Sequence, residues 1–255
     1  MKIGCIGELN ENIAHDVPAT ALYLARAELD VSFFGIATAE AGKNKLTEEG
    51  VNIDLLHDAT LEKFFSKEPV EGIKSSLIQF DYIYVTGKIL SLMNADGRRE
   101  LVKVLNDLRS SGTKVIFDSN HKIAEWSENS CAAKAYSEIL SITDISLPNY
   151  EEEALLFDDK SIAGLISRHH KLGVSEIALK NGVEPNWLST KPKKPPKEFP
   201  LESIEQTAGR TGAGDAFNAA YIATRLSGES YCRSIKKGQI HAAKIVRNAD
   251  PFLAR

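Results

Sequence analysis

Apolar and polar positions along the chain follow two different periods. Short runs rich in β-branched and aromatic residues predict strands, and longer segments with apolar residues three and four positions apart predict helices. The clearest helical segment is 96–110, whose apolar face is formed by Leu101, Val104, Leu105 and Leu108. The pattern predicts strands at 2–7, 31–36, 51–55, 80–86, 114–118, 144–147, 176–180 and 187–190. It predicts helices at 19–28, 43–49, 96–110, 132–140, 149–157, 161–171, 213–226 and 234–247.

Two stretches lack a regular pattern. Between His57 and Ser76 the periodicity is weak, and no element is predicted there. Residues 191–197 read Lys-Pro-Lys-Lys-Pro-Pro-Lys. Because proline donates no backbone hydrogen bond, we interpret this segment as a solvated connection without regular structure inside the domain. The alternative is a basic targeting signal, which is a more specific interpretation, but such short motifs often match by chance.

Strands that alternate with helices predict parallel βαβ units, and therefore an α/β fold of three layers, an α/β/α sandwich around a mostly parallel central sheet. A length of 255 residues fits one domain, 1–255. Ligands of such sheets bind outside the carboxyl ends of the strands. Four polar features are predicted at these ends and should face one crevice: Gly7-Glu8, Asp118-Ser119-Asn120, Pro148-Asn149 and Lys180-Asn181-Gly182.

Composition and charge exclude several classes of protein. Hydrophobic residues make up 43% and charged residues 26% of the chain, as is ordinary for a globular protein. A net charge of −4 gives no sign of a nucleic-acid face, and no apolar run approaches the roughly 18 residues of a membrane span. The first residues are too soon broken by polar positions for a signal peptide. Cys5, Cys131 and Cys232 are scattered, which suits a reducing compartment, so we expect a cytoplasmic protein.

The stretch that carries chemistry is 209–217, Gly-Arg-Thr-Gly-Ala-Gly-Asp-Ala-Phe. Gly212 and Gly214 allow a sharp turn and a close approach of backbone to ligand. The free amides and dipole of the following helix start favour a bound anion. Asp215 in this first turn would repel an anion unless it takes part in chemistry or a cation lies near. The local interpretation is a phosphate cradle with a built-in base, and the alternative is an acid that the helix dipole favours after a glycine turn.

Other familiar motifs are absent from the sequence. There is no G-x-x-x-x-G-K-[ST] loop, and Gly209, Gly212 and Gly214 are not spaced as in dinucleotide-binding folds. No metal-binding H-E-x-x-H or paired C-x-x-C occurs, and no nucleophile elbow is present. His169-His170 is a doublet on a predicted helix. Adjacent residues point to different faces of a helix, so we expect a solvated pair rather than a chelating one.

Segments along nearly the whole chain resemble the ribokinase-like sugar kinases, also called the phosphofructokinase-B family. The run Thr211-Gly212-Ala213-Gly214-Asp215-Ala216-Phe217 is similar to the family's signature near the C-terminus. Asn149-Tyr150-Glu151-Glu152 matches its N-x-x-E, and 177–182 resembles its strand and K-x-G turn on the nucleotide side. Segments 117–126 and 217–226 resemble the 2-keto-3-deoxygluconate kinases within that family.

The resemblance implies ATP-dependent phosphorylation of a sugar or sugar acid, with Mg²⁺ as the metal. It gives Asp215 the role of base toward the attacking hydroxyl, and the amides of Gly212, Ala213 and Gly214 the stabilisation of the transferring phosphoryl group. By the same resemblance Glu152, with Asn149, holds Mg²⁺ through water. The nucleotide is expected at Lys180, Gly182, Thr211 and Asn149, and the sugar substrate at Asp16, Asp118, Asn120 and Lys122, with Lys122 as the cation for a carboxylate.

The sequence departs from the family pattern in four places. Gly209 and Arg210 stand where the family has an acid and a threonine, and only Asp16 remains of the sugar-binding stretch Gly-Gly-Asp. Lys122 stands where the subgroup has arginine. A lysine cannot make the pair of parallel hydrogen bonds to a carboxylate that the arginine fork makes. Residues 50–80 are too few for the family's inserted lid, a small sheet that covers the sugar and excludes water. The lid is therefore expected to be largely absent, unless a homodimer contact or a partner subunit covers the crevice.

Three functions remain open at this stage. The first is an active kinase for 2-keto-3-deoxygluconate, favoured by the glycine loop with Asp215 and by Glu152. The second is a degenerate paralogue that binds nucleotide or a partner without efficient transfer, favoured by the missing lid and glycines. The third is a kinase for another sugar or a nucleoside. We expect a small-molecule substrate and neither a nucleic-acid nor a membrane partner.

Overall fold

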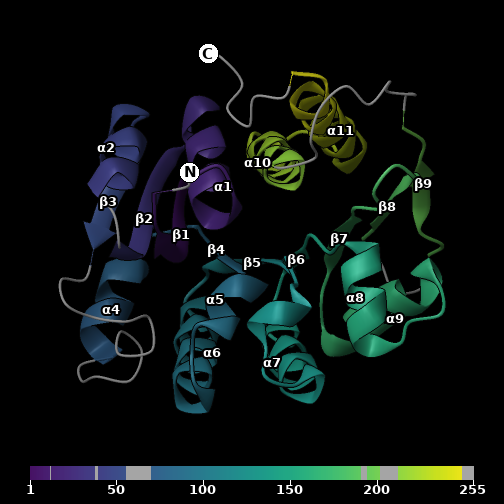
Figure 1. Cartoon of the computed structure of the whole chain (residues 1–255), viewed down its shortest axis with the longest axis horizontal. Helices are drawn as coiled ribbons and strands as arrows, with labels where there is room; N and C mark the ends of the chain where they lie inside the picture. Colours follow the sequence, from purple (N-terminus) through teal and green to yellow (C-terminus); the bar gives the residue numbers. More distant parts are fainter. Residues whose placement is uncertain (12, 38–39, 56–69, 191–193, 202–211, 249–255) are drawn as a thin grey trace.

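The strands form one sheet that crosses the molecule, with helices on both faces (Figure 1). This computed structural model describes residues 1–11, 13–37, 40–55, 70–190, 194–201 and 212–248. The strands are β1 (Lys2–Leu9), β2 (Asp30–Ala37), β3 (Asn52–Leu55), β4 (Tyr82–Thr86), β5 (Lys114–Asp118), β6 (Ile145–Ser146), β7 (Glu176–Leu179), β8 (Asn186–Ser189) and β9 (Lys197–Phe199). Their order is β3-β2-β1-β4-β5-β6-β7-β8-β9.

The pairs among β1 to β7 are parallel, whereas β8 and β9 are added antiparallel at one edge. The carboxyl ends of the parallel strands therefore lie along one side of the sheet, where ligands bind in such folds. Within the described residues every strand belongs to this sheet, and none forms a second sheet over that side. The three-layer α/β architecture predicted from the alternating pattern is confirmed, whereas the single domain 1–255 stays a prediction.

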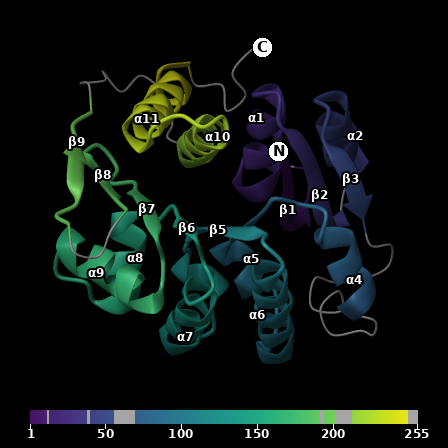
Figure 2. The same cartoon turned by 180° about the vertical axis from the view of Figure 1, so that it is seen from behind.

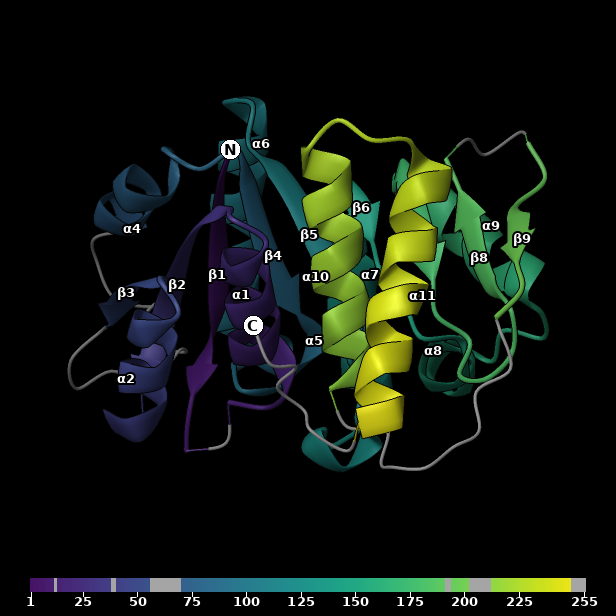
Figure 3. The ribbon, with the colours of Figure 1, turned by 90° about the horizontal axis from the view of Figure 1, so that it is seen from above.

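The helices divide between the two faces of the sheet, as Figures 1 and 2 show from opposite sides. One face carries α1 (Asp16–Arg26), α2 (Glu40–Glu48), α10 (Ala213–Leu226) and α11 (Tyr231–Asn248). The other carries α4 (Val70–Leu77), α5 (Gly87–Ser91), α6 (Ala95–Ser110), α7 (Asn129–Leu140), α8 (Tyr150–Phe157) and α9 (Ile162–Leu172). Figure 3 shows α10 and α11 side by side over the sheet, so the glycine-loop helix has a neighbour along its length.

The core forms where the apolar faces of the helices meet the sheet. The predicted face of α6 is buried, since Leu101, Leu105 and Leu108 are fully enclosed. Burying one such leucine side chain contributes about 1.5–3 kcal/mol. Gly7 of β1 lies under α1, where a Cβ would come within 2.7 Å of the Val17 Cβ. The absence of a side chain at Gly7 thus sets how closely α1 packs, and α1 carries two residues of the site described below.

Several sequence predictions need correction. The weak region 57–76 ends in a helix, α4, and α5 follows β4 directly; neither was predicted. Gly7-Glu8 was predicted at a strand end, but β1 continues to Leu9, so this pair lies inside the strand. Lys197 was predicted to lie outside regular structure, but it begins β9, which pairs with β8. Of the basic segment, residues 191–193 lie outside the described part of the chain.

The expectation of a solvated histidine pair is wrong for His169. Its side chain is fully buried, because it shares the inner face of α9 with Leu165 and Ile166. Its Nε2 lies 2.7 Å from Glu153 Oε2, so the buried imidazole faces a buried carboxylate. His170 points elsewhere, to the Val174 carbonyl and, at 2.7 Å, to the Ser189 hydroxyl. Adjacent residues do take different faces, but neither face leaves the ring free in solvent.

Across the part of the chain that the structure describes, no helix is long and apolar enough to cross a membrane.

Candidate active site

A buried polar network joins the carboxyl ends of β4, β5 and β7 to α10. Lys180, directly after β7, donates from Nζ to Asp118 Oδ1 at 2.8 Å and to Asn218 Oδ1 at 3.0 Å. Asn218 in turn donates from Nδ2 to Asp118 Oδ2 at 2.8 Å and to the Tyr84 hydroxyl at 3.2 Å. Asp118, Asn218 and Tyr84 are buried, so each hydrogen bond here compensates a costly desolvation. The sequence predicted that Asp118 and Lys180 come together, and in the structure their side chains are in direct contact.

Asp215 lies beside this network, in the first turn of α10. Gly212 precedes the helix with φ +78°, a left-handed conformation that glycine adopts without strain. The Asp215 carboxylate accepts from the Asp16 backbone amide at 3.1 Å and from the Thr20 hydroxyl at 3.3 Å. Both donors come from the start of α1, so two helices that are far apart in sequence meet at this carboxylate.

The surroundings of Asp215 shift its acidity. Burial raises its pKa well above the usual range for aspartate, and the nearby carboxylates of Asp16 and Asp118 raise it further. The ammonium of Lys180 and the hydrogen bond from the Asp16 amide oppose this shift. A carboxyl group with a raised pKa is a stronger base once it is ionised. Burial, two neighbouring carboxylates and the ammonium of Lys180 therefore act together on the charge state of Asp215.

Asp16 and Asn120 form a second pair at the same edge. Asn120 donates from Nδ2 to Asp16 Oδ1 at 2.7 Å. Both residues have positive φ angles, +61° and +31°, which side-chain-bearing residues adopt at a cost. Burial raises the pKa of Asp16, whereas Thr86, Asn120 and Lys88 oppose this shift. The two side chains are thus held in place by their backbone conformation as well as by each other.

Glu152 is on the other side of Asp118, in the first turn of α8. Its Oε2 accepts from the His121 backbone amide at 2.9 Å. Burial and the charge of Asp118 raise the pKa of Glu152 to about 7. Asn149 precedes α8 and caps it, because its Oδ1 accepts from the Glu151 amide at 3.1 Å. Asn149 also pairs with Lys180 in a parallel bridge, which places the start of α8 next to the network.

Four of the remaining predicted residues lie in the described part of the chain. Gly214 lies over Lys180, since a Cβ there would be 4.0 Å from Lys180 Nζ. Gly182 takes a φ of +60° in the turn after β7, next to Glu151 of α8. Lys122 is exposed after β5, and its charge acts on His15. Ala213 is the first residue of α10, and Thr211 lies outside the described residues.

Sequence reasoning missed three members of the site: Thr20, Tyr84 and Asn218. Asn218 lies three residues after Asp215 on α10, and this helical spacing was the signal that could have placed both on one side. Thr20 lies four residues after Asp16 on α1, which carries the same signal. Tyr84 sits inside an alternating apolar strand, where only the tertiary structure reveals that its hydroxyl meets Thr20, Asn218 and Asp118.

Comparison with known proteins decides the family. A model of the pfkB family carbohydrate kinases matches residues 21–251, nearly the whole chain. The chain belongs to the pfkB family of carbohydrate kinases. This confirms the family resemblance seen in the sequence, and with it an ATP-dependent carbohydrate kinase as the class of enzyme. Asp215 and the glycine loop lie within the matched residues.

Several curated relatives of this pfkB family kinase are named 2-dehydro-3-deoxygluconokinase. The 2-dehydro-3-deoxygluconokinase of Dickeya dadantii is 28% identical over 279 aligned positions, which cover 94% of this chain and 89% of the relative. The 2-dehydro-3-deoxygluconokinase of Escherichia coli K12 is 29% identical, and the match covers 78% of this chain and 65% of the relative. Both cover the larger part of this kinase, although the Escherichia coli enzyme extends well beyond the match.

Solved structures agree on the fold. An Escherichia coli protein described as a ribokinase II, solved with ATP and Mg²⁺, has a TM-score of 0.76 at 18% sequence identity. The superposition covers 98% of this chain and 94% of that one. At this identity the similarity supports the ribokinase-like fold and nothing finer.

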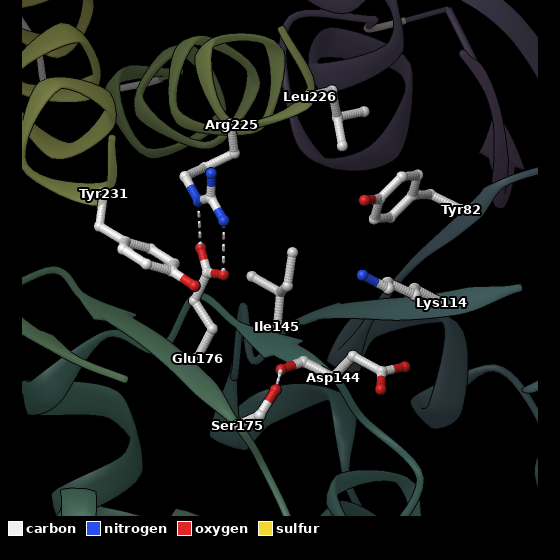
Figure 4. A pocket seen from close by; sticks show the side chains of 9 residues that line it. All are labelled: Tyr82, Lys114, Asp144, Ile145, Ser175, Glu176, Arg225, Leu226 and Tyr231. Atoms are coloured by element: carbon white, nitrogen blue, oxygen red, sulfur yellow. Dashed lines mark hydrogen bonds and ion pairs between the residues drawn. The ribbon is translucent and has the colours of Figure 1, made fainter. Parts of the chain in front are cut away.

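A cavity of about 150 Å³ opens at the opposite, amino-terminal end of the strands in this pfkB family kinase (Figure 4). Its acidic side chains are paired: Glu176 accepts from Arg225 Nε at 2.9 Å and from the Tyr221 hydroxyl at 2.6 Å. Asp144 is held by both nitrogens of the Arg109 fork. We interpret this cavity as part of the packing of α10 and α11 on the sheet, because it lies away from Asp215 and its strand ends.

Proposed function

We propose that this chain transfers the γ-phosphoryl group of ATP to a hydroxyl of 2-keto-3-deoxygluconate, the substrate named by its curated relatives. The observation that carries the proposal is the position of Asp215. It lies between a glycine-initiated helix start and the substrate-side pair Asp16–Asn120, and its pKa is raised. A base at the junction of an anion cradle and a hydroxyl-binding pair is the arrangement that phosphoryl transfer to an alcohol requires.

Asp215 accepts the proton of the attacking hydroxyl. Its Oδ2 is fixed by the Asp16 amide and its Oδ1 by the Thr20 hydroxyl, so the carboxylate is held in one orientation. The ammonium of Lys180 lowers the pKa of Asp215 and so opposes the effect of burial. Holding base and substrate in register is a major part of catalysis in phosphoryl transfer, where the protein has little covalent chemistry to perform.

The start of α10 stabilises charge on the transferring group. The amides of Gly212, Ala213 and Gly214 are at a helix start, where backbone donors have no partner within the helix. Preorganised donors of this kind contribute roughly 3–4 kcal/mol each in comparable anion holes. Lys180 reaches the underside of Gly214, which brings an ammonium to the same place. No Walker-type lysine is needed, because these groups together neutralise the phosphates.

The residues present fit a magnesium ion bound largely through water. Glu152 is a single half-buried carboxylate with a raised pKa, and among the described residues no group of three or more acidic, His or Cys side chains forms a full metal cage. Mg²⁺ keeps several waters and uses few carboxylates beside substrate phosphates, which suits this donor set. Glu152 would hold the ion with Asn149 nearby, and the ion would supply charge neutralisation on the phosphates.

We assign two sets of residues to the two ligands. The sugar substrate is bound by Asp16, Asn120, Asp118 and Lys122. The nucleotide is bound by Lys180, Gly182, Thr211 and Asn149. The Asp16–Asn120 pair offers a carboxylate and an amide to sugar hydroxyls. Asp118 is held in place by its hydrogen bonds from Lys180 and Asn218. Lys122 is exposed at the outer end of this group, so it is available to a charged part of the substrate.

The test is ADP release with ATP and Mg²⁺ against a panel of 2-keto-3-deoxygluconate, gluconate, fructose, ribose and a nucleoside. We expect the first to give the highest kcat/KM. Asp215→Asn should lower kcat by about 10²-fold or more, as loss of a general base does. Asp96→Asn on the exposed surface of α6 is the matched control and should leave kcat unchanged. Sugar-dependent ADP release that Asp215→Asn does not reduce would remove the base from the proposal.

A second candidate function is nucleotide binding without efficient transfer. It is favoured because the described strands all belong to one sheet and none of them covers the sugar side. A homodimer or a partner subunit that covers this side would restore a closed site, and light scattering of the purified chain with and without ligands tests this. Calorimetric binding of ATP together with no sugar-dependent ADP release, in any oligomeric state, would favour this second function. A preference for ribose or a nucleoside would favour a kinase for another substrate.

A further inference from the structure

Two lysines follow the carboxyl ends of the neighbouring strands β4 and β5. Lys88 is in α5, directly after β4, and Lys122 precedes the short 3₁₀ turn at Ile123–Glu125 after β5. Thr86 and Asp118, the last residues of the two strands, are register partners. The chain therefore leaves both strands at the same level, on the side of the sheet where the Asp16–Asn120 pair lies.

Gly87 holds the start of α5 close to β5. A Cβ at Gly87 would overlap the Ser119 carbonyl and the Tyr136 hydroxyl, so a side chain there would push α5 away. The Tyr136 hydroxyl donates to the same Ser119 carbonyl at 2.9 Å, which fixes the backbone between Asp118 and Asn120. The position of Lys88 is thus set by packing against the segment that carries the substrate-side residues.

The charges of both lysines reach the same residue. His15 immediately precedes Asp16, and its pKa is lowered by burial first and then by Lys122 and Lys88. Lys88 also acts on Asp16 itself. The Asp16 amide donates to Asp215, so the two ammonium groups act on the segment that positions the proposed base.

Neither lysine forms a salt bridge with another residue that the structure describes. Among the residues that the structure describes, the salt bridges involve other cations, and Asp16 Oδ1 is occupied by Asn120 at 2.7 Å. Glu125, the acid of the adjacent turn, accepts from the Ser91 hydroxyl at 3.4 Å. Two lysines without such salt bridges at the carboxyl ends of neighbouring strands favour an anionic ligand, because ammonium–carboxylate hydrogen bonds are about twice as strong as neutral ones.

We propose that Lys88 is a specificity-determining residue which, together with Lys122, binds the anionic group of the sugar, so that the site selects sugar acids over neutral sugars. This inference rests on the proposed function, since it takes the side of the sheet with Asp16 and Asn120 as the substrate side. A carboxylate and a phosphate ester share the required chemistry, and the experiment separates them. A neutral sugar offers no counter-charge to either ammonium group.

Binding is measured first, without catalysis. The chain has six histidines, so the NMR signal of His15 is assigned with His15→Asn and its pKa is titrated. Lys88→Met should raise the pKa of His15. Binding of 2-keto-3-deoxygluconate to the wild type should also raise it, because the carboxylate offsets both lysines, whereas fructose should not. By calorimetry, Lys88→Met should weaken binding of the acid at least about 10-fold and leave fructose unchanged.

Turnover gives the second readout, with fructose 6-phosphate added as the phosphate ester. Lys88→Met and Lys122→Met should each lower kcat/KM for the acid at least about 10-fold, mainly through KM, and leave kcat/KM for fructose within about twofold. Lys134 is an exposed lysine of α7, and Lys134→Met is the control, which should leave kcat/KM unchanged for both substrates.

Three outcomes overturn the inference: equal wild-type affinity for acid and fructose, equal loss for both substrates in Lys88→Met, or Lys88-dependent binding that is tighter for fructose 6-phosphate than for the acid. Lys88-dependent binding of the acid without any ADP release supports the inference while refuting the kinase function proposed above. Efficient phosphorylation of the acid, with equal losses for acid and fructose in Lys88→Met, supports the proposed kinase function while refuting the inference. The two proposals can therefore fail separately.

Discussion

Lys180 Nζ lies 2.8 Å from Asp118 Oδ1, in an ion pair that is almost closed to solvent and that sits beside the proposed base. Lys180 lowers the pKa of both Asp215 and Glu152, and Asp118 raises both. This one pair therefore contributes to the charge balance between the proposed sugar side and the proposed metal side of the site. Removing one partner leaves the other charge buried, which costs about 3–5 kcal/mol in comparable pairs.

Replacing Lys180 should move the pH dependence of catalysis. Asp215 acts as a base only when ionised, so kcat/KM falls as pH drops through its raised pKa. Because Lys180 lowers that pKa, Lys180→Met should shift the acidic limb of the kcat/KM profile to higher pH. Thermal unfolding is followed in parallel, and Lys180→Met with Asp118→Asn should recover part of the lost stability. An unshifted limb in a folded Lys180→Met variant would contradict this coupling.

Asn218 should matter for stability as much as for activity. It is fully buried and its amide links Lys180, Asp118 and the Tyr84 hydroxyl. Asn218→Leu keeps the branched shape of the side chain but leaves these groups unsatisfied, so we expect a loss of about 1–3 kcal/mol in the free energy of unfolding. Denaturant unfolding measures the loss, with Asn106→Leu on α6 as the control. A loss confined to activity, with unchanged stability, would argue against the network as a structural unit.

A separate buried cluster predicts the acid stability of the fold. Glu153 is buried and accepts from Arg168 Nη2 at 2.9 Å, with His169 Nε2 at 2.7 Å. Although burial alone raises its pKa, these partners outweigh it and hold the pKa of Glu153 at about 2, below the ordinary 4.5. Because the pKa is lower in the folded state than in the unfolded state, ionised Glu153 stabilises the fold. This contribution is on the order of 3 kcal/mol, is complete above about pH 4.5 and is lost as the pH falls toward about 2.

Unfolding free energy measured between pH 6 and pH 2 tests this. Glu153→Gln should be less stable than the wild type at neutral pH, and the gap should narrow as the pH falls. Glu151→Gln, exposed in the same helix turn, is the control and should track the wild type. A constant gap across the whole pH range would mean that the loss comes from packing and not from the charge of Glu153.

Two helical glycines should respond in opposite ways to alanine. Gly238 of α11 faces α10, where a Cβ would lie 2.7 Å from Phe217 Cδ2, so Gly238→Ala should destabilise by about 1–3 kcal/mol. Gly164 of α9 has its nearest neighbour at 3.4 Å, and Gly164→Ala should be neutral or gain up to about 1 kcal/mol from helix propensity. Chemical denaturation compares them directly. Because Phe217 follows the glycine loop in α10, a loss of kcat in Gly238→Ala beyond the loss of stability would show that α11 also positions Asp215.

The sequence by itself determined the alternation of strands and helices, because burial of one helix face or a whole strand leaves a local period in the chain. It also located the glycine loop with Asp215, since a sharp turn into a helix needs glycine at fixed positions. It failed for α4 and α5, where short segments carry too few turns for a period to show, and for His169, whose burial depends on what α9 packs against.

The tertiary structure alone decided which side chains meet. Lys180 pairs with Asp118 across 62 positions, Asn218 reaches Asp118 across 100, and Thr20 reaches Asp215 across 195. These contacts follow from the order of the strands, which places β5 and β7 on either side of β6 and brings α1 beside α10. Strand order depends on the packing of all layers at once, so no local pattern encodes it. The sequence located the glycine loop and predicted that Asp118 and Lys180 face one crevice, whereas only the tertiary structure decided how their charges act on Asp215.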